Sequence, residues 1–263
     1  MTSTTDPQLI DSHFHSVTMQ EQGIDFKEMA ANNFGGTVKA GLDICISPDD
    51  FKQHILLTEN FPWIHWAVGI HSLEGAREDP MDLINRFVLY IRNPRVAAVG
   101  ETGIDNYRNN VPKEEQEKLF RFHIDRAMDF GLPLVIHNRE ADEEVYSILS
   151  EKKPPNGGIM HCYSSDYKWA KKFMNLGFLI SFAGNVTYKG SDDIRETAAK
   201  IPEDMILAET DAPFLSPQPV RKEKNHPGLI MYTYKELALL RRKSVEHLAE
   251  AIYTNFVQIL HLD

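Results

Sequence analysis

Eight short apolar runs recur along the chain, and longer stretches with a helical pattern separate them. The runs are rich in β-branched residues, which is typical of strands. Alternation of such strands with helices predicts a parallel sheet with helices on its faces. The predicted strands are residues 8–15, 36–44, 63–71, 96–103, 132–137, 157–162, 178–184 and 205–211.

The stretches between the runs carry apolar residues at helical spacing. In residues 49–60, for example, Phe51, Ile55 and Leu56 recur at this spacing. Ser244 stands where the N-cap of the last helix is expected. The predicted helices are residues 49–60, 81–91, 114–130, 143–150, 167–176, 192–200, 231–242 and 245–260.

Eight strand–helix repeats fit one α/β domain over residues 1–263, folded as a (β/α)8 TIM barrel. A doubly wound open sheet is the alternative. Polar residues at the carboxyl ends of the runs favour the barrel, because those ends converge on one mouth in a barrel but spread along an edge in an open sheet. These residues are His13, His15, His71, Glu101, His137, His161 and Asp211.

The sequence LIDSHFHS places two histidines one residue apart at the end of the first run. In a strand, Asp11, His13 and His15 share one face. Polar groups of this kind are buried only when something satisfies them, and a cation would do so. A surface strand with solvated histidines is the alternative.

Six residues at the run ends form a donor set that suits divalent ions. Four imidazoles and two carboxylates suffice for two ions with one carboxylate between them. Each residue alone has a structural alternative; Asp211, for example, can cap a turn before Pro213. Their recurrence at five strand ends favours the metal interpretation. The set is His13, His15, Glu101, His137, His161 and Asp211, whereas we interpret His54, His65, His123, His247 and His261 as structural.

Composition narrows the remaining classes of function. The net charge is −10 and no run of lysine and arginine occurs, so a large electrostatic surface for nucleic acid is not indicated. The two cysteines, Cys45 and Cys162, lack a paired spacing, which argues against a disulfide framework. No signal peptide and no apolar run of membrane-spanning length occurs. We therefore expect a soluble, cytoplasmic monomer with no membrane partner.

From about Leu9 to Leu260 the chain resembles the TatD-type metal-dependent deoxyribonucleases. The resemblance rests on successive blocks in the family's order: DSHFH, GETGIDNYR, PLVIHNREA, HCYS, LGFLISFAGNVTYK and AETDAPFLSP. The H-x-H block is shared by many amidohydrolase-type barrels. The glutamate block, joined with HCYS and ETDAP, is much more specific.

The resemblance implies a barrel that hydrolyses the phosphodiesters of a DNA substrate with two divalent ions and a metal-activated water. Histidine-rich ligation suits Zn²⁺ or Mn²⁺, while the family suggests Mg²⁺. By position, one ion would be held by His13, His15 and Asp211, the second by His137 and His161, and Glu101 would bridge the two.

The resemblance also implies roles around these ligands. Asp211 would accept the proton of the attacking water. His71 would lie near the substrate phosphate, Arg139 is a candidate either for contacting that phosphate or for supporting a ligand, and Glu209 would support a ligand from behind. We interpret Cys162 as packing, because a residue that follows His161 on a strand faces away from it.

The chain departs from the family at three places without losing a ligand. Ser72 replaces a proline after His71, Ser16 and Val17 replace an aliphatic residue and an aspartate, and Asn106 interrupts an aspartate–tyrosine pair. These differences bear on substrate preference and rate more than on the chemistry.

Three functions stay open. The favoured one is an exonucleolytic enzyme acting on single strands or ends, with a shallow salt dependence because few cations are present. Tyr107 or Phe214 is a candidate base-stacking residue, although loop packing is the simpler interpretation. The second is a related hydrolase of esters or amides, such as a D-aminoacyl-tRNA deacylase. The third is a scaffold without activity, which the intact set of ligands disfavours. An amidohydrolase with a carboxylated lysine is disfavoured by Glu101.

Overall fold

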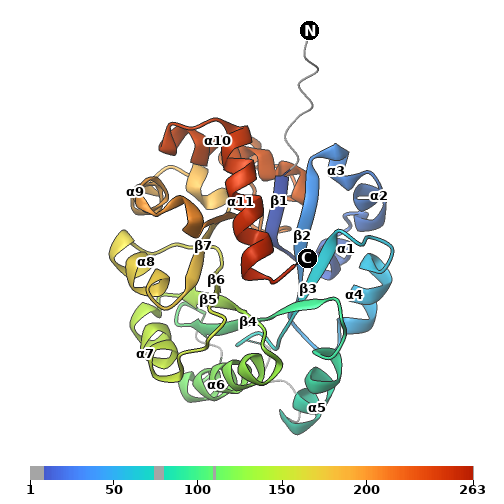
Figure 1. Ribbon diagram of the computed structural model, residues 1–263. Coiled ribbons are helices and arrows are strands. Elements are labelled where there is room, and N and C mark those ends of the chain that lie inside the picture. Colours follow the sequence, from blue (N-terminus) through green and yellow to red (C-terminus); the bar gives the residue numbers. More distant parts are fainter. Residues whose placement is uncertain (1–8, 74–79, 109–110, 263) are drawn as a thin grey trace.

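The computed structural model describes residues 9–73, 80–108 and 111–262, and within them eight parallel strands form one sheet in chain order, β1 to β8 (Figure 1). The helices surround this sheet on the outside, as the TIM-barrel prediction requires. Gln8, which begins the first predicted run, lies outside the described residues. The strands are β1 Leu9–Phe14, β2 Val38–Cys45, β3 Ile64–Val68, β4 Val96–Asp105, β5 Leu134–Arg139, β6 Gly158–Met160, β7 Phe178–Phe182 and β8 Ile206–Ala208.

All eight predicted helices are present, with end points that differ by a few residues. They are α4 Phe51–Thr58, α5 Pro80–Tyr90, α6 Lys113–Phe130, α7 Asp142–Lys152, α8 Tyr167–Met174, α9 Asp192–Lys200, α10 Ile230–Arg241 and α11 Val245–Ile259. Ser244 caps α11 as predicted, because its side chain accepts a hydrogen bond from the backbone N–H of His247.

Three further helices between β1 and β2 are absent from the predicted set. They are too short for a repeating apolar face, and side-chain caps mark where the second and third of them start: Asp25 accepts from Glu28 N, and Asn32 accepts from Gly35 N. These helices are α1 Ser16–Glu21, α2 Phe26–Ala31 and α3 Asn33–Gly36, and short 3-10 turns occupy Gly184–Thr187, Glu203–Met205, Gln218–Val220 and Pro227–Leu229.

The barrel closes between β1 and the residues that follow β8. Phe14 and Ala212 form a parallel bridge, His15 N donates to Ala212 O at 2.8 Å, and Asp211 N donates to His13 O at 3.0 Å. Closure therefore uses the same residues that the sequence predicts as metal ligands. This seam joins the first strand to the segment that follows the last strand. Its hydrogen bonds hold these two distant parts of the chain together.

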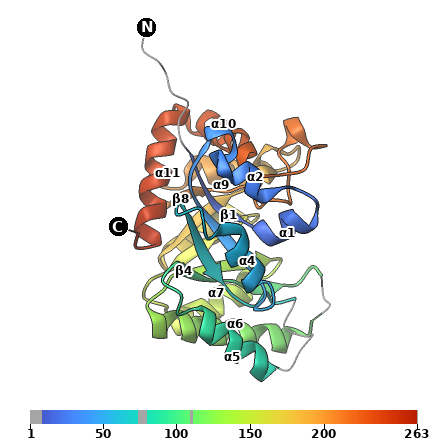
Figure 2. The same ribbon diagram turned by 90° about the vertical axis from the view of Figure 1, so that its right-hand side faces the viewer.

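The last helix covers the end of the barrel at which the strands begin. α11 packs against β1, β8 and the turn that precedes β8 (Figure 2). Its Asn255 side chain donates to Glu203 O at 2.8 Å and to Ile206 O at 2.9 Å. In the described part of the chain, no helix combines the length and apolar character needed to cross a membrane.

Five of the eight strands end earlier than predicted, and the early ends of β6 and β8 each place a candidate ligand. β6 ends at Met160 and β8 at Ala208, so His161 and Asp211 lie just beyond them. Cys162 and Asp211 have left-handed backbone angles, with φ of 45° and 54°, which turn the chain away from the strand direction. The interpretation of Cys162 as a strand residue facing away from His161 is therefore wrong, because strand alternation no longer applies there.

Candidate metal centre

The six predicted ligands meet in one buried cluster at the carboxyl ends of the strands. Three groups of donor atoms lie close enough to hold an ion, with all ligand atoms of a group within 4.8 Å of one another. Two of these groups share Glu101, and two share His13. The groups are His13, Glu101 and His161; His13, His15 and Asp211; and His71, Glu101 and His137.

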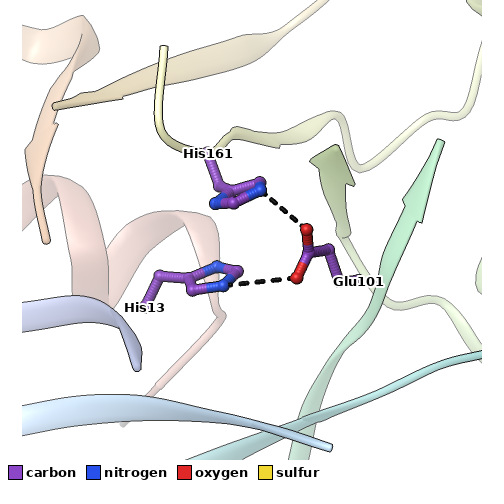
Figure 3. A group of neighbouring side chains, drawn as sticks. All are labelled: His13, Glu101 and His161. Atoms are coloured by element: carbon purple, nitrogen blue, oxygen red, sulfur yellow. Dashed lines mark ion pairs between the residues drawn. The ribbon is translucent and has the colours of Figure 1, made fainter. Parts of the chain in front are cut away.

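Glu101 lies at the centre of the cluster and divides its two oxygens between the two sides. Its Oε2 faces the rings from β1, at 3.5 Å from His13 Nε2 and 3.8 Å from His15 Nε2. Its Oε1 lies 2.7 Å from His137 Nδ1 and 2.8 Å from His161 Nε2. Figure 3 shows one oxygen directed to His161 and the other to His13. The two oxygens of one carboxylate therefore face two different pairs of imidazoles.

His13, His15 and Asp211 converge on one side of Glu101. The two imidazole Nε2 atoms are 3.1 Å apart, and Asp211 Oδ1 lies 3.7 Å from His13 Nε2 and 3.5 Å from His15 Nε2. These three residues come from the end of β1 and from the segment after β8, which together close the barrel. The side is therefore assembled only when β1 and the segment after β8 are in register.

His137 and His161 converge on the other side, from the neighbouring strands β5 and β6. His137 Nδ1 lies 3.3 Å from His161 Nε2. His71, from the end of β3, places its Nε2 3.4 Å from Glu101 Oε1. His71 therefore lies as close to the bridging carboxylate as the predicted ligands do, rather than at the rim of the mouth.

Two further carboxylates lie against the rings of His137 and His161, one against each ring. Asp105 Oδ2 lies 3.1 Å from His137 Nε2, and Glu209 Oε1 lies 3.3 Å from His161 Nδ1. Such a partner fixes the orientation and the tautomer of a ligating ring. Glu209 is predicted in this position, whereas Asp105 is not among the predicted residues. The signal for Asp105 is its spacing, because four residues after Glu101 on the same strand lie on the same face.

The histidines from β1 are held through the backbone instead. Asp11 Oδ1 accepts hydrogen bonds from His13 N at 3.2 Å and Thr210 N at 2.9 Å, and its Oδ2 accepts from the Thr210 hydroxyl at 2.6 Å. Asp43, on β2, accepts from the N–H of Ser16 at 2.8 Å and from its hydroxyl at 2.5 Å. Both aspartates are completely buried.

Local backbone features bring the ligands this close. At Gly103, opposite His137 on the paired strand, an added Cβ would lie 1.9 Å from the carbonyl oxygen of His137. Only glycine lets β4 approach β5 at this level. Asp211 is one of the few non-glycine residues with positive φ, a conformation that aspartate tolerates better than most residues.

The charges of the cluster are strongly coupled. Burial opposes ionisation of Glu101, yet His161 and His71 outweigh it and hold the pKa of this carboxyl well below its usual range. Burial likewise opposes protonation of His161, yet Glu101 and Glu209 raise the pKa of this imidazole well above its usual value. The cluster thus favours an ionised Glu101 beside a protonated His161, whereas burial lowers the pKa of the neighbouring His13 and His71 imidazoles. Divalent cations fit the same positions, because imidazole and carboxylate are their common ligands.

Arg139 does not contact the cluster directly. Its guanidinium lies over the ring of Tyr107, 4.1 Å from the centroid, at the end of β5 and beyond His137. Phe214, the other exposed aromatic at the mouth, packs edge-on against His15, with centroids 5.8 Å apart.

The histidines interpreted as structural lie away from the ligand groups. His54 is buried on α4 and pairs with Asp43 at 2.9 Å. His123 is buried on α6, accepts a hydrogen bond from Ile70 N at 3.0 Å and lies 3.1 Å from the Thr102 hydroxyl. His65 lies on β3, His247 pairs with Glu203 on the surface, and His261 follows α11.

Comparison with known proteins identifies the family of this chain. The family model described as TatD related DNase matches residues 10–261. A Bacillus subtilis protein named "Uncharacterized metal-dependent hydrolase YabD" is 30% identical over 260 residues, which cover 97% of this chain and 100% of that protein. An Escherichia coli K12 protein named "Uncharacterized metal-dependent hydrolase YcfH" is 31% identical over 258 residues. The match covers 97% of this chain and 96% of that protein.

A solved structure agrees with the sequence relatives. The crystal structure of YjjV, a TatD homologue from Escherichia coli K12, superposes with a TM-score of 0.88 at 25% sequence identity and covers 97% of this chain and 98% of its own. The match across nearly the whole length includes every strand that supplies a donor to the cluster. The chain belongs to the TatD-related DNase family of metal-dependent hydrolases.

Proposed function

We propose that this protein is a two-metal deoxyribonuclease that hydrolyses DNA phosphodiesters, exonucleolytically and with a preference for single strands or ends. The observation that carries the proposal is the division of Glu101, whose Oε2 faces His13 and His15 while its Oε1 faces His137 and His161. A carboxylate shared in this way would be able to hold two cations side by side. Two-metal sites of this kind are characteristic of nucleases and phosphatases.

The magnitude of the reaction barrier supports a metal-dependent mechanism. Enzymes supply roughly 8–23 kcal/mol of barrier reduction, whereas one positioned acid or base contributes only about 10²–10⁴-fold in rate. When bound, divalent ions such as Mg²⁺, Mn²⁺ or Zn²⁺ would activate water and neutralise the phosphate. His13, His15 and Asp211 would hold one ion, His137 and His161 the other, and Glu101 both.

The remaining roles fall to side chains around the ligands. Asp211 is slightly exposed, and its Oδ1 lies 3.7 Å from His13 Nε2 and 3.5 Å from His15 Nε2, so it would accept the proton of a water attacking beside these residues. His71 and Arg139 would bind phosphate oxygens. Glu209 and Asp105 would keep the rings of His161 and His137 in the ligating orientation.

The proposal includes the setting of the enzyme. We propose one domain over residues 1–263 that acts as a monomer in the cytoplasm. The two cysteines, Cys45 and Cys162, are both free, which is compatible with a reducing compartment.

The test is cleavage of labelled single-stranded and duplex oligonucleotides by purified protein, first stripped with a chelator and then reloaded separately with Mg²⁺, Mn²⁺ or Zn²⁺. We expect mononucleotide release that requires an added ion and is faster on single strands. Glu250→Gln serves as the matched control for Glu101→Gln and should cleave like wild type. Glu250 is exposed on α11, at the opposite end of the barrel from the cluster. Release of an amino acid from aminoacyl-tRNA without DNA cleavage would replace this function by the ester-hydrolysing alternative.

A further inference from the structure

Tyr107 and Arg139 form a stacked pair at the mouth, one layer above the cluster. The Tyr107 ring is 58% exposed, and the Arg139 guanidinium lies over it at 4.1 Å. Arg139 comes two residues after His137 on β5, which places it about 7 Å further along the strand at 3.3 Å per residue. One face of the tyrosine ring is covered by the cation, and the ring remains open to solvent.

This pair is tied to the cluster through Asp105. The Oδ2 of Asp105 lies 3.1 Å from His137 Nε2, while its Oδ1 accepts hydrogen bonds from Tyr107 N at 2.9 Å and Arg108 N at 2.8 Å. A single buried carboxylate therefore fixes both a candidate ligand and the backbone that carries the exposed ring. The ring is held at a set position relative to the cluster.

A second arginine–tyrosine pair lies on the β7–β8 side of the mouth. The Arg221 guanidinium lies 4.3 Å from the centre of the Tyr188 ring and donates to the Tyr188 hydroxyl at 2.6 Å. The hydroxyl in turn donates to Ser216 O at 2.9 Å. Tyr188 follows the turn after β7, and Arg221 follows the turn in the segment after β8. The two pairs thus flank β6 and its His161.

Neither guanidinium has a carboxylate partner within the part of the chain that the structure describes, although the chain carries 38 acidic residues. On the outer helices, by contrast, Arg121 pairs with Glu151 and Arg126 with Asp129. An arginine stacked on an aromatic ring can still direct N–H groups at phosphate oxygens, which match its fork of donors. In Arg221 only Nη1 is already used, because it donates to the Tyr188 hydroxyl and to Ser216 O. Exposed aromatic rings stack with nucleobases of any sequence.

We propose that the two pairs bind one nucleic acid strand on either side of the phosphodiester that is cleaved, with a base stacked on Tyr107, its phosphate on Arg139, and a second backbone phosphate on Arg221. This inference rests on the proposed nuclease function and adds its substrate-binding residues. The bound strand is single, because a base that stacks on Tyr107 is unpaired from a complementary strand. The duplex substrate must fray before it binds.

The test separates binding from cleavage by using a short fluorescent single strand with phosphorothioate linkages that resist hydrolysis. Its affinity is measured by anisotropy with the ion-loaded enzyme and with Tyr107→Ala, Tyr107→Phe and Arg221→Ala. Stacking contributes about 1–3 kcal/mol per base, so Tyr107→Ala should weaken binding roughly 5- to 150-fold while Tyr107→Phe restores it. Arg221→Ala should lower the log–log salt slope by about 0.7, the contribution of one phosphate on a single strand.

Two controls define the overturning results. Lys243→Ala removes an equal charge beyond α10, near the end of the barrel opposite the mouth, and should leave affinity and slope unchanged. A strand with an abasic site at the stacked nucleotide should bind wild type and Tyr107→Ala equally. An unchanged affinity of Tyr107→Ala for the normal strand, or an equal loss on the abasic strand, overturns the stacking. An unchanged salt slope in Arg221→Ala overturns the second phosphate contact.

The result also distinguishes this inference from the function on which it rests. If wild type cleaves unmodified DNA but these variants bind like wild type, only the arginine–tyrosine sites are wrong. If wild type cleaves no DNA with any of the ions, the nuclease function is wrong, and the anisotropy of the Tyr107 variants still decides whether a strand binds here.

Discussion

The two sides of the cluster are held by carboxylates in different ways. On the β1 side, which comprises His13, His15 and Asp211, the buried carboxylates of Asp11 and Asp43 accept backbone N–H groups. On the β5–β6 side, which comprises His137 and His161, the carboxylates of Asp105 and Glu209 lie against the imidazole rings.

The difference follows from where each side lies in the fold. The β1 side spans the seam, where the first strand meets the segment after the last, so the chain path itself has to be fixed. The β5–β6 side lies on adjacent strands whose path is already set by their pairing, so only the rings need orientation. Removing a carboxylate should therefore reduce stability on the first side and ion affinity on the second.

The largest effect is expected where both sides meet. Glu101→Ala should abolish the bridge and lower kcat/KM for DNA cleavage by on the order of 10³-fold. The number of bound divalent ions per chain, measured by elemental analysis, should fall with it. Wild-type cleavage by Glu101→Ala and Glu101→Gln would mean that the cluster is not the reaction centre.

The seam should be most sensitive at Asp11. Asp11→Ala leaves three buried donors on His13 and Thr210 without an acceptor, which should lower the free energy of unfolding by about 2–4 kcal/mol. Asp11→Asn keeps the Oδ1 acceptor for the two backbone N–H groups and loses only the acceptor for the Thr210 hydroxyl, so it should cost less than Asp11→Ala. Urea unfolding of the ion-free protein measures both; equal stability of the alanine variant and wild type contradicts the seam role.

The buried His123 side chain links Ile70, which follows β3, to Thr102 on β4. It should make the free energy of unfolding depend on pH. Burial lowers the pKa of His123 to about 4, below the unfolded value of 6.5. Between these values the unfolded chain binds one more proton than the fold, so the stability due to this group is complete above pH 6.5 and falls as the pH drops towards 4. The slope is about 1.4 kcal/mol per pH unit.

His123→Gln should remove this contribution. Unfolding in denaturant at several pH values between 4 and 7, with a chelator present, should show a slope shallower than wild type by about one proton. His247→Gln is the control, because His247 is exposed on α11 and should leave the slope almost unchanged. Parallel pH profiles for wild type and His123→Gln would contradict the assignment.

The smallest change is expected on the β5–β6 side. Asp105→Asn keeps the Oδ1 acceptor for Tyr107 and Arg108 and alters only the atom that faces His137. Ion affinity, measured by calorimetric titration with Mn²⁺ or Zn²⁺, should fall about 10–100-fold with little change in unfolding free energy. A large loss of stability with unchanged ion affinity would erase the contrast between the two sides.

The order of elements and the identity of the donors follow from the sequence alone. Apolar runs such as 132–137 are local patterns, and the residues that end them reach one mouth in any parallel barrel. The cap at Ser244 is equally local and was predicted correctly. The short helices between β1 and β2 cannot be predicted from such patterns, because one or two turns are too short to show a helical periodicity.

Only the tertiary structure decides which side chains support the donors. Asp11 reaches Thr210 across the seam, and Arg221 reaches Tyr188 from the next loop, over separations in sequence that no local pattern records. The division of the Glu101 oxygens likewise depends on strand pairing and on the close approach at Gly103. Residue types set which chemistry is available, but the register of the closed sheet sets the distances at which it works.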